Sequence, residues 1–175
     1  SYTFTPDHDE PRSGERSLRV DNVGSEPYGA VYQTIDAAPY RGRTLVFSAW
    51  MKTKDTRGNR FGKGAGLKLH AMKNGYPSAV KQMRRDAIDG TTGWTRYQLE
   101  LAVPPDATQI EVGLNLFGPG TAWLDDVALE AVGPEETILR YKVHATVGGK
   151  IAQLGARLID ATAKNGGELE IVLEP

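Results

Sequence analysis

Hydrophobic and polar residues alternate with a period of two in short segments that run from residue 15 to residue 131. Such alternation is typical of strands that bury one face and expose the other. Turn signals that contain Gly or Pro, such as SEPYG, APYRG and DGTTG, separate the segments. The strands predicted in this way are 15–22, 29–36, 43–53, 64–72, 95–103, 108–117 and 121–130. The pattern predicts an all-β fold, an antiparallel β-sandwich, over residues 1–131.

The character of the chain changes in residues 132–175. A linker by composition, AVGPEE, is followed by a predicted strand at 138–147. One apolar stripe at helical spacing comes next, made of Val147, Ile151, Leu154 and Leu158. The stripe predicts one C-terminal α-helix over 148–164, which Asn165-Gly166-Gly167 is expected to end. A terminal strand is predicted at 168–174, so this region is interpreted as an appendage to the sandwich.

Alternate residues on paired strands share a face, which divides the strand residues into two sets. The core set is Val31, Leu45, Phe47, Leu67, Leu69, Val112, Leu114 and Leu116. The opposite set is Tyr32, Thr34, Ser48, Trp50, Lys52, Lys68, His70, Met72, Asn115 and Phe117. Trp94, Tyr97 and Trp123 are interpreted as structural, because they open a strand after a turn or alternate with acids.

The opposite set combines aromatic rings with amide, imidazole and amine groups, a mixture that suits a sugar-like ligand. Aromatic rings stack on the apolar faces of a pyranose, and the polar groups orient it through hydrogen bonds. The residues expected to bind a saccharide or similar polar small ligand are Tyr32, Trp50, Lys68, His70, Asn115 and Phe117. The alternative is that Trp50 and Phe117 only pack, under the long connections 54–63 and 73–94 or under the C-terminal helix.

Charge is unevenly distributed although the net charge is −1. Residues 52–96 hold eleven Lys or Arg against three acids, whereas residues 97–131 hold six acids and no base. Such asymmetry can steer an anionic ligand, although charged side chains on solvated loops are the simpler explanation. Lys81, Arg84 and Arg85 lie near Tyr76 and Phe61 in the sequence, as in proteins that bind single strands. Nucleic acid is nevertheless disfavoured, because the pI is about 6.3.

The order of several short motifs resembles the galactose-binding-domain-like modules, jelly rolls attached to many bacterial enzymes and regulators, and several carbohydrate-binding module families. The motifs are SGERSL, YQTI, AWMKT, GWTRY and WLDDV. The resemblance implies a jelly-roll fold and favours a secreted or cell-surface protein. It says little about the class of ligand, because the same fold hosts unrelated functions. In similar modules, acids near these positions hold a structural calcium ion. The corresponding acids here are Asp7, Asp9, Glu10, Asp125 and Asp126. The alternative is that these acids are solvated or cap turns.

The tail resembles a different family. The string from Gly148 to Asp160, with the preceding YKVHATV, is similar to the end of the carbon monoxide dehydrogenase G family, a helix-grip fold. Because the preceding residues belong to another architecture, the chain is interpreted as a mosaic or an engineered fusion. The function of that family is not carried over to this chain.

Three functions follow from these observations. The first is a non-catalytic accessory module that binds a carbohydrate. The second is a structural or oligomerisation module, in which the C-terminal helix covers the polar face and joins copies of the chain. The third is a hydrolase-type enzyme that uses His70 or paired acids, although the three histidines lie on separate segments and no catalytic motif is present. No cysteine is available for a disulfide, and no apolar run approaches the roughly 20 residues that span a bilayer.

Overall fold

The structure is a computed structural model that describes residues 2–133, 139–144, 157–164 and 168–174. The chain divides into two compact units, residues 1–133 and 134–175. No helix in the described ranges is long and apolar enough to cross a membrane.

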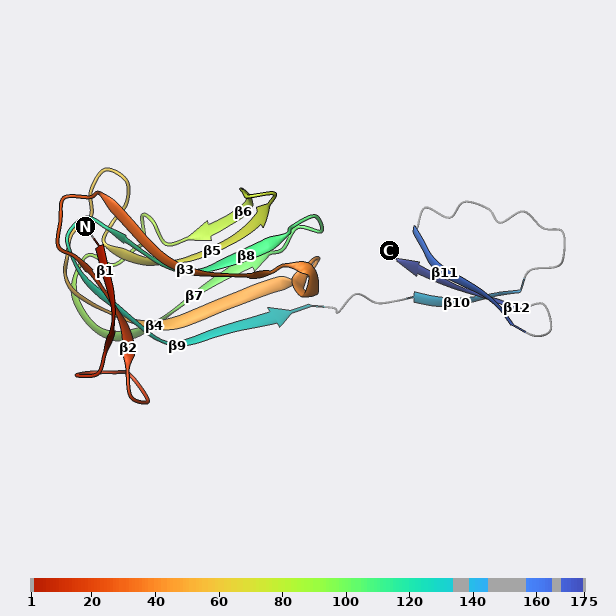
Figure 1. Cartoon of the computed structure of the whole chain (residues 1–175), viewed down its shortest axis with the longest axis horizontal. Coiled ribbons are helices and arrows are strands. Elements are labelled where there is room, and N and C mark those ends of the chain that lie inside the picture. Colours follow the sequence, from red (N-terminus) through yellow and green to blue (C-terminus); the bar gives the residue numbers. More distant parts are fainter. Residues whose placement is uncertain (1, 134–138, 145–156, 165–167, 175) are drawn as a thin grey trace. The chain divides into compact units, whose positions relative to one another are not determined.

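Residues 2–133 form two antiparallel sheets that face each other as a sandwich (Figure 1). The five-stranded sheet has the order β1-β2-β9-β4-β7, and the four-stranded sheet has the order β3-β8-β5-β6. The strands of the first sheet are β1 (Tyr2–Asp7), β2 (Ser17–Asn22), β9 (Gly120–Val132), β4 (Thr44–Thr56) and β7 (Gly90–Ala102). Those of the second are β3 (Tyr28–Asp36), β8 (Gln109–Phe117), β5 (Ala65–Lys73) and β6 (Tyr76–Gln82). A 3-10 helix, η1 (Ala38–Tyr40), follows β3.

The core between the sheets contains the residues that alternation predicts. Seven of the eight predicted core residues are buried, and Val31 is partly buried against them. Phe47 on β4 and Leu114 on β8 are fully buried. Because burial of each large apolar side chain is worth roughly 1.5–3 kcal/mol, this core stabilises the sandwich without disulfides.

All seven predicted strands are present, but two further strands were not predicted. These are β1 and β6, and each is an edge strand with a proline, at Pro6 and Pro77. Proline is tolerated at edges because it has no N–H to give to a ladder. The connection predicted at 73–94 therefore contains β6 and the start of β7.

In the second unit, the described residues form a three-stranded antiparallel sheet with the order β10-β12-β11. Strands β10 (Leu139–His144) and β12 (Glu168–Glu174) confirm the two strands predicted in the tail. The predicted helix is wrong over its second half, because Arg157–Lys164 is strand β11, paired with β12. In sequence, the helix-stop signal Asn165-Gly166-Gly167 is also typical of hairpin turns, and these three residues lie outside the described ones. The first half, 148–156, lies outside the described residues.

Candidate functional site

The sandwich has two outer faces, and the predicted ligand residues divide between them. Tyr32, Lys68, His70, Asn115 and Phe117 belong to the four-stranded sheet, whereas Trp50 belongs to the five-stranded sheet. The prediction that all six share one face is therefore wrong for Trp50. Alternation within a strand separates inward from outward positions, but it does not say to which sheet the strand belongs.

The strand register brings the remaining five residues together. Tyr32 on β3 pairs with Gly113 on β8, which pairs with Lys68 on β5, which pairs with Gln82 on β6. Residues directly opposite each other in antiparallel strands lie on the same face. We call this outer surface the four-strand face, and its members are Tyr28, Tyr32, Lys68, His70, Gln82, Glu111, Asn115 and Phe117.

An ion pair and a cation–π contact organise one part of the four-strand face. The Nζ of Lys68, a residue only 7% exposed, lies 2.6 Å from Oε2 of Glu111. The same Nζ lies 4.0 Å from the centroid of the Tyr32 ring. Because Tyr32 is 50% exposed, half of its surface stays accessible beside the Lys68 ammonium group, which Glu111 holds in place.

A chain of hydrogen bonds organises the rest. The Oη of Tyr28 donates to Oδ1 of the fully buried Asn115 at 3.1 Å. Gln82 Oε1 accepts from Asn115 Nδ2 at 3.4 Å and lies 3.2 Å from His70 Nε2. Burial and then the charge of Lys68 lower the pKa of His70. Because the Gln82 oxygen can only accept, Nε2 of His70 is the donor in this contact. Burial raises the pKa of Tyr28, which keeps its phenol a donor.

Phe117 is only 5% exposed, because the connection between β4 and β5 lies over it. A Cβ built on Gly62 would lie 2.8 Å from the Phe117 ring, so the loop backbone covers that ring. The remaining edge of Phe117 lines a hollow of about 340 Å³ together with Pro27, Tyr28, Phe61, Gln82 and Arg84. The loop thus covers most of the Phe117 ring, and the part that stays accessible forms the floor of the hollow.

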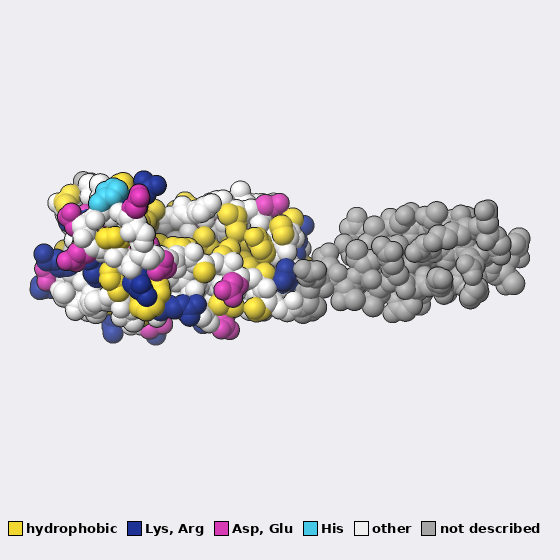
Figure 2. Space-filling model, turned by 90° about the horizontal axis from the view of Figure 1, so that it is seen from below, with side chains coloured by type: hydrophobic (Ala, Val, Ile, Leu, Met, Phe, Trp, Pro, Cys, Tyr) yellow, Lys and Arg dark blue, Asp and Glu magenta, His cyan; other side chains and the backbone are white. Residues whose placement is uncertain are grey.

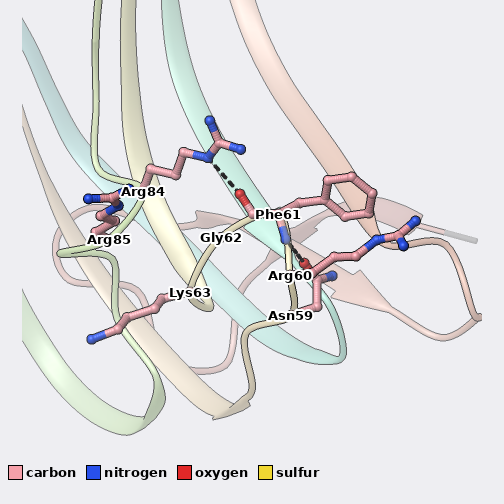
Figure 3. A pocket seen from close by; sticks show the side chains of 7 residues that line it. All are labelled: Asn59, Arg60, Phe61, Gly62, Lys63, Arg84 and Arg85. Atoms are coloured by element: carbon pink, nitrogen blue, oxygen red, sulfur yellow. Dashed lines mark hydrogen bonds between the residues drawn. The ribbon is translucent and has the colours of Figure 1, made fainter.

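A second hollow, of about 330 Å³, adjoins the first and shares Phe61 and Arg84 with it. Its lining is Asn59, Arg60, Phe61, Gly62, Lys63, Arg84 and Arg85 (Figure 3). The backbone oxygen of Phe61 accepts a hydrogen bond from Arg84 Nε at 2.6 Å, and Asn59 Oδ1 accepts one from the Phe61 N–H at 2.9 Å. We call this second hollow the basic hollow.

Sequence reasoning missed three members of the four-strand face, Tyr28, Gln82 and Glu111, and most of the residues that line the two hollows. Tyr28 and Glu111 each lie four residues before a predicted site residue on the same strand, so the period of two could have found them. Gln82 was missed because β6 was not predicted. Phe61 was noted only as a neighbour of basic residues, since its position depends on how the loop folds.

Trp50 lies on the outer face of the five-stranded sheet, where cations cover the indole rings. Arg12 lies 4.3 Å from the Trp50 ring, and Lys52 lies 4.5 Å from Trp123 and 5.3 Å from Trp94. Figure 2 views this side and shows hydrophobic side chains of the sandwich interspersed with basic and acidic ones. Trp123 is 7% exposed, in keeping with its structural interpretation.

Four of the five predicted calcium ligands, all except Asp9, have carboxylates engaged by other partners. Asp7 Oδ2 accepts from Trp123 Nε1 at 2.6 Å, which lowers the pKa of Asp7. Asp7 also accepts from the backbone N–H of Asp9, and Glu10 forms an ion pair with Lys52. Asp125 Oδ2 accepts from the backbone N–H groups of Arg12 and Ser13. Asp126 accepts from the Ser13 hydroxyl. Within the described part of the chain, no group of three or more His, Asp or Glu is placed to hold a metal. These acids thus do not fit a calcium cage, and calcium stays a prediction from the resemblance.

Comparisons with known proteins identify the fold. No family model matches the chain, so the resemblance of the tail to the carbon monoxide dehydrogenase G family stays a prediction. An uncharacterised HTH-type transcriptional regulator of Bacillus subtilis, YbfP, is 29% identical over 117 residues, 67% of this chain and 38% of the regulator. The chain thus spans well under half of that relative.

Solved structures that are similar include carbohydrate-binding modules. The CBM22-1 xylan-binding domain of Paenibacillus barcinonensis Xyn10C has a TM-score of 0.55 at 12% identity, over 76% of this chain and 83% of that one. A family 16 carbohydrate-binding module has a TM-score of 0.53 at 14% identity, over 74% and 86%. The enzymatically active domain of bacteriophage CBA120 tailspike protein 4 has a TM-score of 0.58 at 19% identity, over 75% and 18%. At these identities the likeness shows the fold: residues 2–133 have the β-sandwich that carbohydrate-binding modules share, as predicted.

Proposed function

We propose that residues 1–133 are a non-catalytic module that binds a carbohydrate, or a similar polar small ligand, on the four-strand face. The observation that carries the proposal is the pair of half-exposed tyrosines, Tyr28 and Tyr32, beside a fixed polar network. Tyrosine rings stack on the apolar face of a sugar, while donors and acceptors next to them orient its hydroxyl groups.

The network supports binding because it is already ordered. Lys68 is held by Glu111, and Asn115 is held between Tyr28 and Gln82. Groups that are fixed before the ligand arrives lose little conformational entropy on binding, so more of the contact energy appears as affinity. Carbohydrate-binding modules with the same sandwich give this proposal a precedent in fold.

The two other functions remain predictions. His70 has an amide, Gln82, as its hydrogen-bond partner, and an amide does not stabilise a protonated imidazole as a carboxylate does in a catalytic pair. Oligomerisation through the C-terminal helix now rests on residues 148–156 alone, which lie outside the described residues.

Titration calorimetry after a glycan-array screen tests the proposed site. Tyr32→Ala removes a stacking surface and the cation–π contact of Lys68, so we expect affinity for the array-selected glycan to fall about tenfold or more. Tyr76→Ala is the matched control, because Tyr76 is 77% exposed at the β5–β6 turn, about 16 Å along the strand from the Lys68 row. Unchanged affinity in Tyr32→Ala, or equal losses in both variants, would contradict the proposed site.

A second role is favoured by the match to a transcriptional regulator. We propose that ligand binding by the sandwich is signalled to the segment that follows it, as a sensing module requires. Hydrogen exchange of the whole chain, with and without the glycan, should then change in residues 134–175 as well as on the four-strand face. Changes confined to residues 1–133 would contradict signalling and leave binding intact.

A further inference from the structure

The basic hollow carries a concentrated positive charge. Seven residues line it, of which Arg60, Lys63, Arg84 and Arg85 are cationic and none is acidic. The four cations come from two separate segments, the β4–β5 connection and the segment after β6. Folding therefore gathers charges that are about 20 residues apart in the sequence.

The structure does not neutralise these cations internally. Among the described residues, the ion pairs engage Arg19, Lys52, Lys68 and Lys73, and none engages a cation of the basic hollow. The nearby acids are used by backbone N–H groups: Asp86 Oδ1 accepts from Arg84, and Asp89 Oδ1 accepts from Gly58 and Gly64. Four exposed cations without acid partners make this hollow a region of positive potential.

The basic hollow is continuous with the proposed sugar site. Phe61 and Arg84 line both hollows, and the first hollow also contains Tyr28 and Gln82 of the four-strand face. The bond from Arg84 Nε to the Phe61 carbonyl fixes the guanidinium at this shared wall. Its two terminal nitrogens remain as a fork suited to a carboxylate or sulfate.

The cations of the two segments point in different directions (Figure 3). Arg84, Arg60 and Lys63 diverge around Phe61, so one small anion does not reach all of them. A chain that carries an acidic group on successive units would meet several of them in turn. The spread of the charges therefore favours an extended polyanion.

We propose that the ligand is an acidic oligosaccharide, whose sugar rings contact Tyr28 and Tyr32 and whose carboxylates or sulfates bind Arg84, Arg60, Lys63 and Arg85. This inference rests on the proposed carbohydrate-binding function and specifies the ligand class. An oligosaccharide is favoured over a nucleic acid because the hollow leads onto a face of tyrosines and hydrogen-bonding side chains, in a chain of net charge −1.

The test compares matched ligands on the full chain by titration calorimetry. The probes are hexagalacturonate, the same oligosaccharide with its carboxylates reduced to alcohols, a carrageenan hexasaccharide that carries only sulfates, and a single-stranded DNA oligonucleotide. We expect at least one acidic probe to bind about tenfold or more tightly than the reduced form, with a preference that weakens from about 50 to 300 mM salt. The two acidic probes distinguish carboxylate from sulfate.

Substitutions locate the charge effect. Arg84→Gln and Arg85→Gln should each lower affinity for the better acidic probe about tenfold. Arg85→Gln, at a residue that lines only the basic hollow, should leave binding of the reduced form nearly unchanged. Arg85→Gln keeps the test valid if loss of the Arg84–Phe61 bond shifts the loop. Arg16→Gln is the control, because this exposed arginine lies on the β1–β2 connection and lines neither hollow.

The results separate this inference from the proposed function. Equal affinity for acidic and reduced probes overturns the acidic ligand while the carbohydrate module stands. Tighter binding of DNA than of either acidic probe overturns the ligand class. An equal loss of affinity in Arg16→Gln overturns the assignment of the acidic groups to the basic hollow. Binding of no oligosaccharide at all overturns both proposals.

Discussion

Lys68 and Glu111 form a nearly buried ion pair on the four-strand face, with side chains 8% and 14% exposed. An ammonium group in this position is stable only because its partner and the Tyr32 ring compensate for lost hydration. The pair thus fixes the place of Tyr32 as well as its own. At the scale of single residues, the face is held together by charge as much as by packing.

Glu111→Leu should be strongly destabilising, because it leaves the Lys68 ammonium buried without a partner. We expect a loss of about 3–5 kcal/mol in the free energy of unfolding, measured by urea titration. The double variant Lys68→Met with Glu111→Leu should recover most of that loss, since it removes both charges. The exposed pair Lys73–Asp106 is the control, and Asp106→Asn should cost about 1 kcal/mol or less. A double variant as unstable as the single one would contradict the argument.

His70 should make the stability of the sandwich depend on pH. Its pKa is lowered in the folded state from the ordinary value of 6.5, first by burial and then by Lys68. Between 6.5 and the lower folded pKa, the unfolded chain binds a proton that the folded chain does not, so stability falls as the pH falls. Unfolding measured at about pH 7.5 and 5.5 should show a smaller loss in His70→Gln than in the unsubstituted chain.

The matched control for this prediction is His8→Gln, which removes an exposed histidine on the β1–β2 connection. Since both variants remove one histidine, the comparison isolates the environment of His70. An identical pH dependence in His70→Gln and the unsubstituted chain would show that His70 does not couple to folding.

At the scale of strands, much of the fold could be predicted from alternation, but the assignment of strands to sheets could not. Whether Val31 and Leu114 point inward follows from local sequence. Whether β4 and β5 belong to one sheet depends on long-range pairing, which leaves no local signal. For this reason Lys68, His70 and Asn115 were predicted together correctly, and Trp50 was placed with them in error.

The close pairing of β3 and β8 depends on Gly113, which lies between Tyr32 and Lys68 on the four-strand face. A Cβ at this position would lie 2.0 Å from the Val31 carbonyl oxygen and 2.6 Å from the Tyr32 Cα. Because these are backbone atoms, the strands would have to separate. We expect Gly113→Ala to cost about 1–3 kcal/mol of stability and to weaken glycan binding.

Gly93→Ala on β7 is the control for this prediction, because its Cβ would meet nothing within 4 Å. Thermal unfolding and calorimetry of the two variants provide the measurement. If Gly113→Ala keeps both the stability and the affinity of the unsubstituted chain, the close approach of β3 and β8 is not what positions Tyr32.

At the scale of the whole molecule, the uneven charge of the sequence is resolved by strand pairing. Lys68 and Lys73, from the basic segment 52–96, pair with Glu111 and Asp106, from the acidic segment 97–131. In the described part of the chain, the cations left without an acid include those of the basic hollow. The charge that remains after folding is therefore concentrated beside the proposed binding site.

The first unit should fold and bind without the second. Every strand of residues 2–133 pairs within that unit, and the core lies entirely inside it. We expect a fragment of residues 1–133 to unfold cooperatively by circular dichroism and to bind the glycan, because every residue of the four-strand face lies in it. A folded fragment that binds more tightly would mean that residues 134–175 restrict access to the four-strand face, as the structural alternative requires. A fragment that does not fold would mean that the second unit contributes stability to the sandwich. The prediction that the first unit folds and binds by itself would then be wrong.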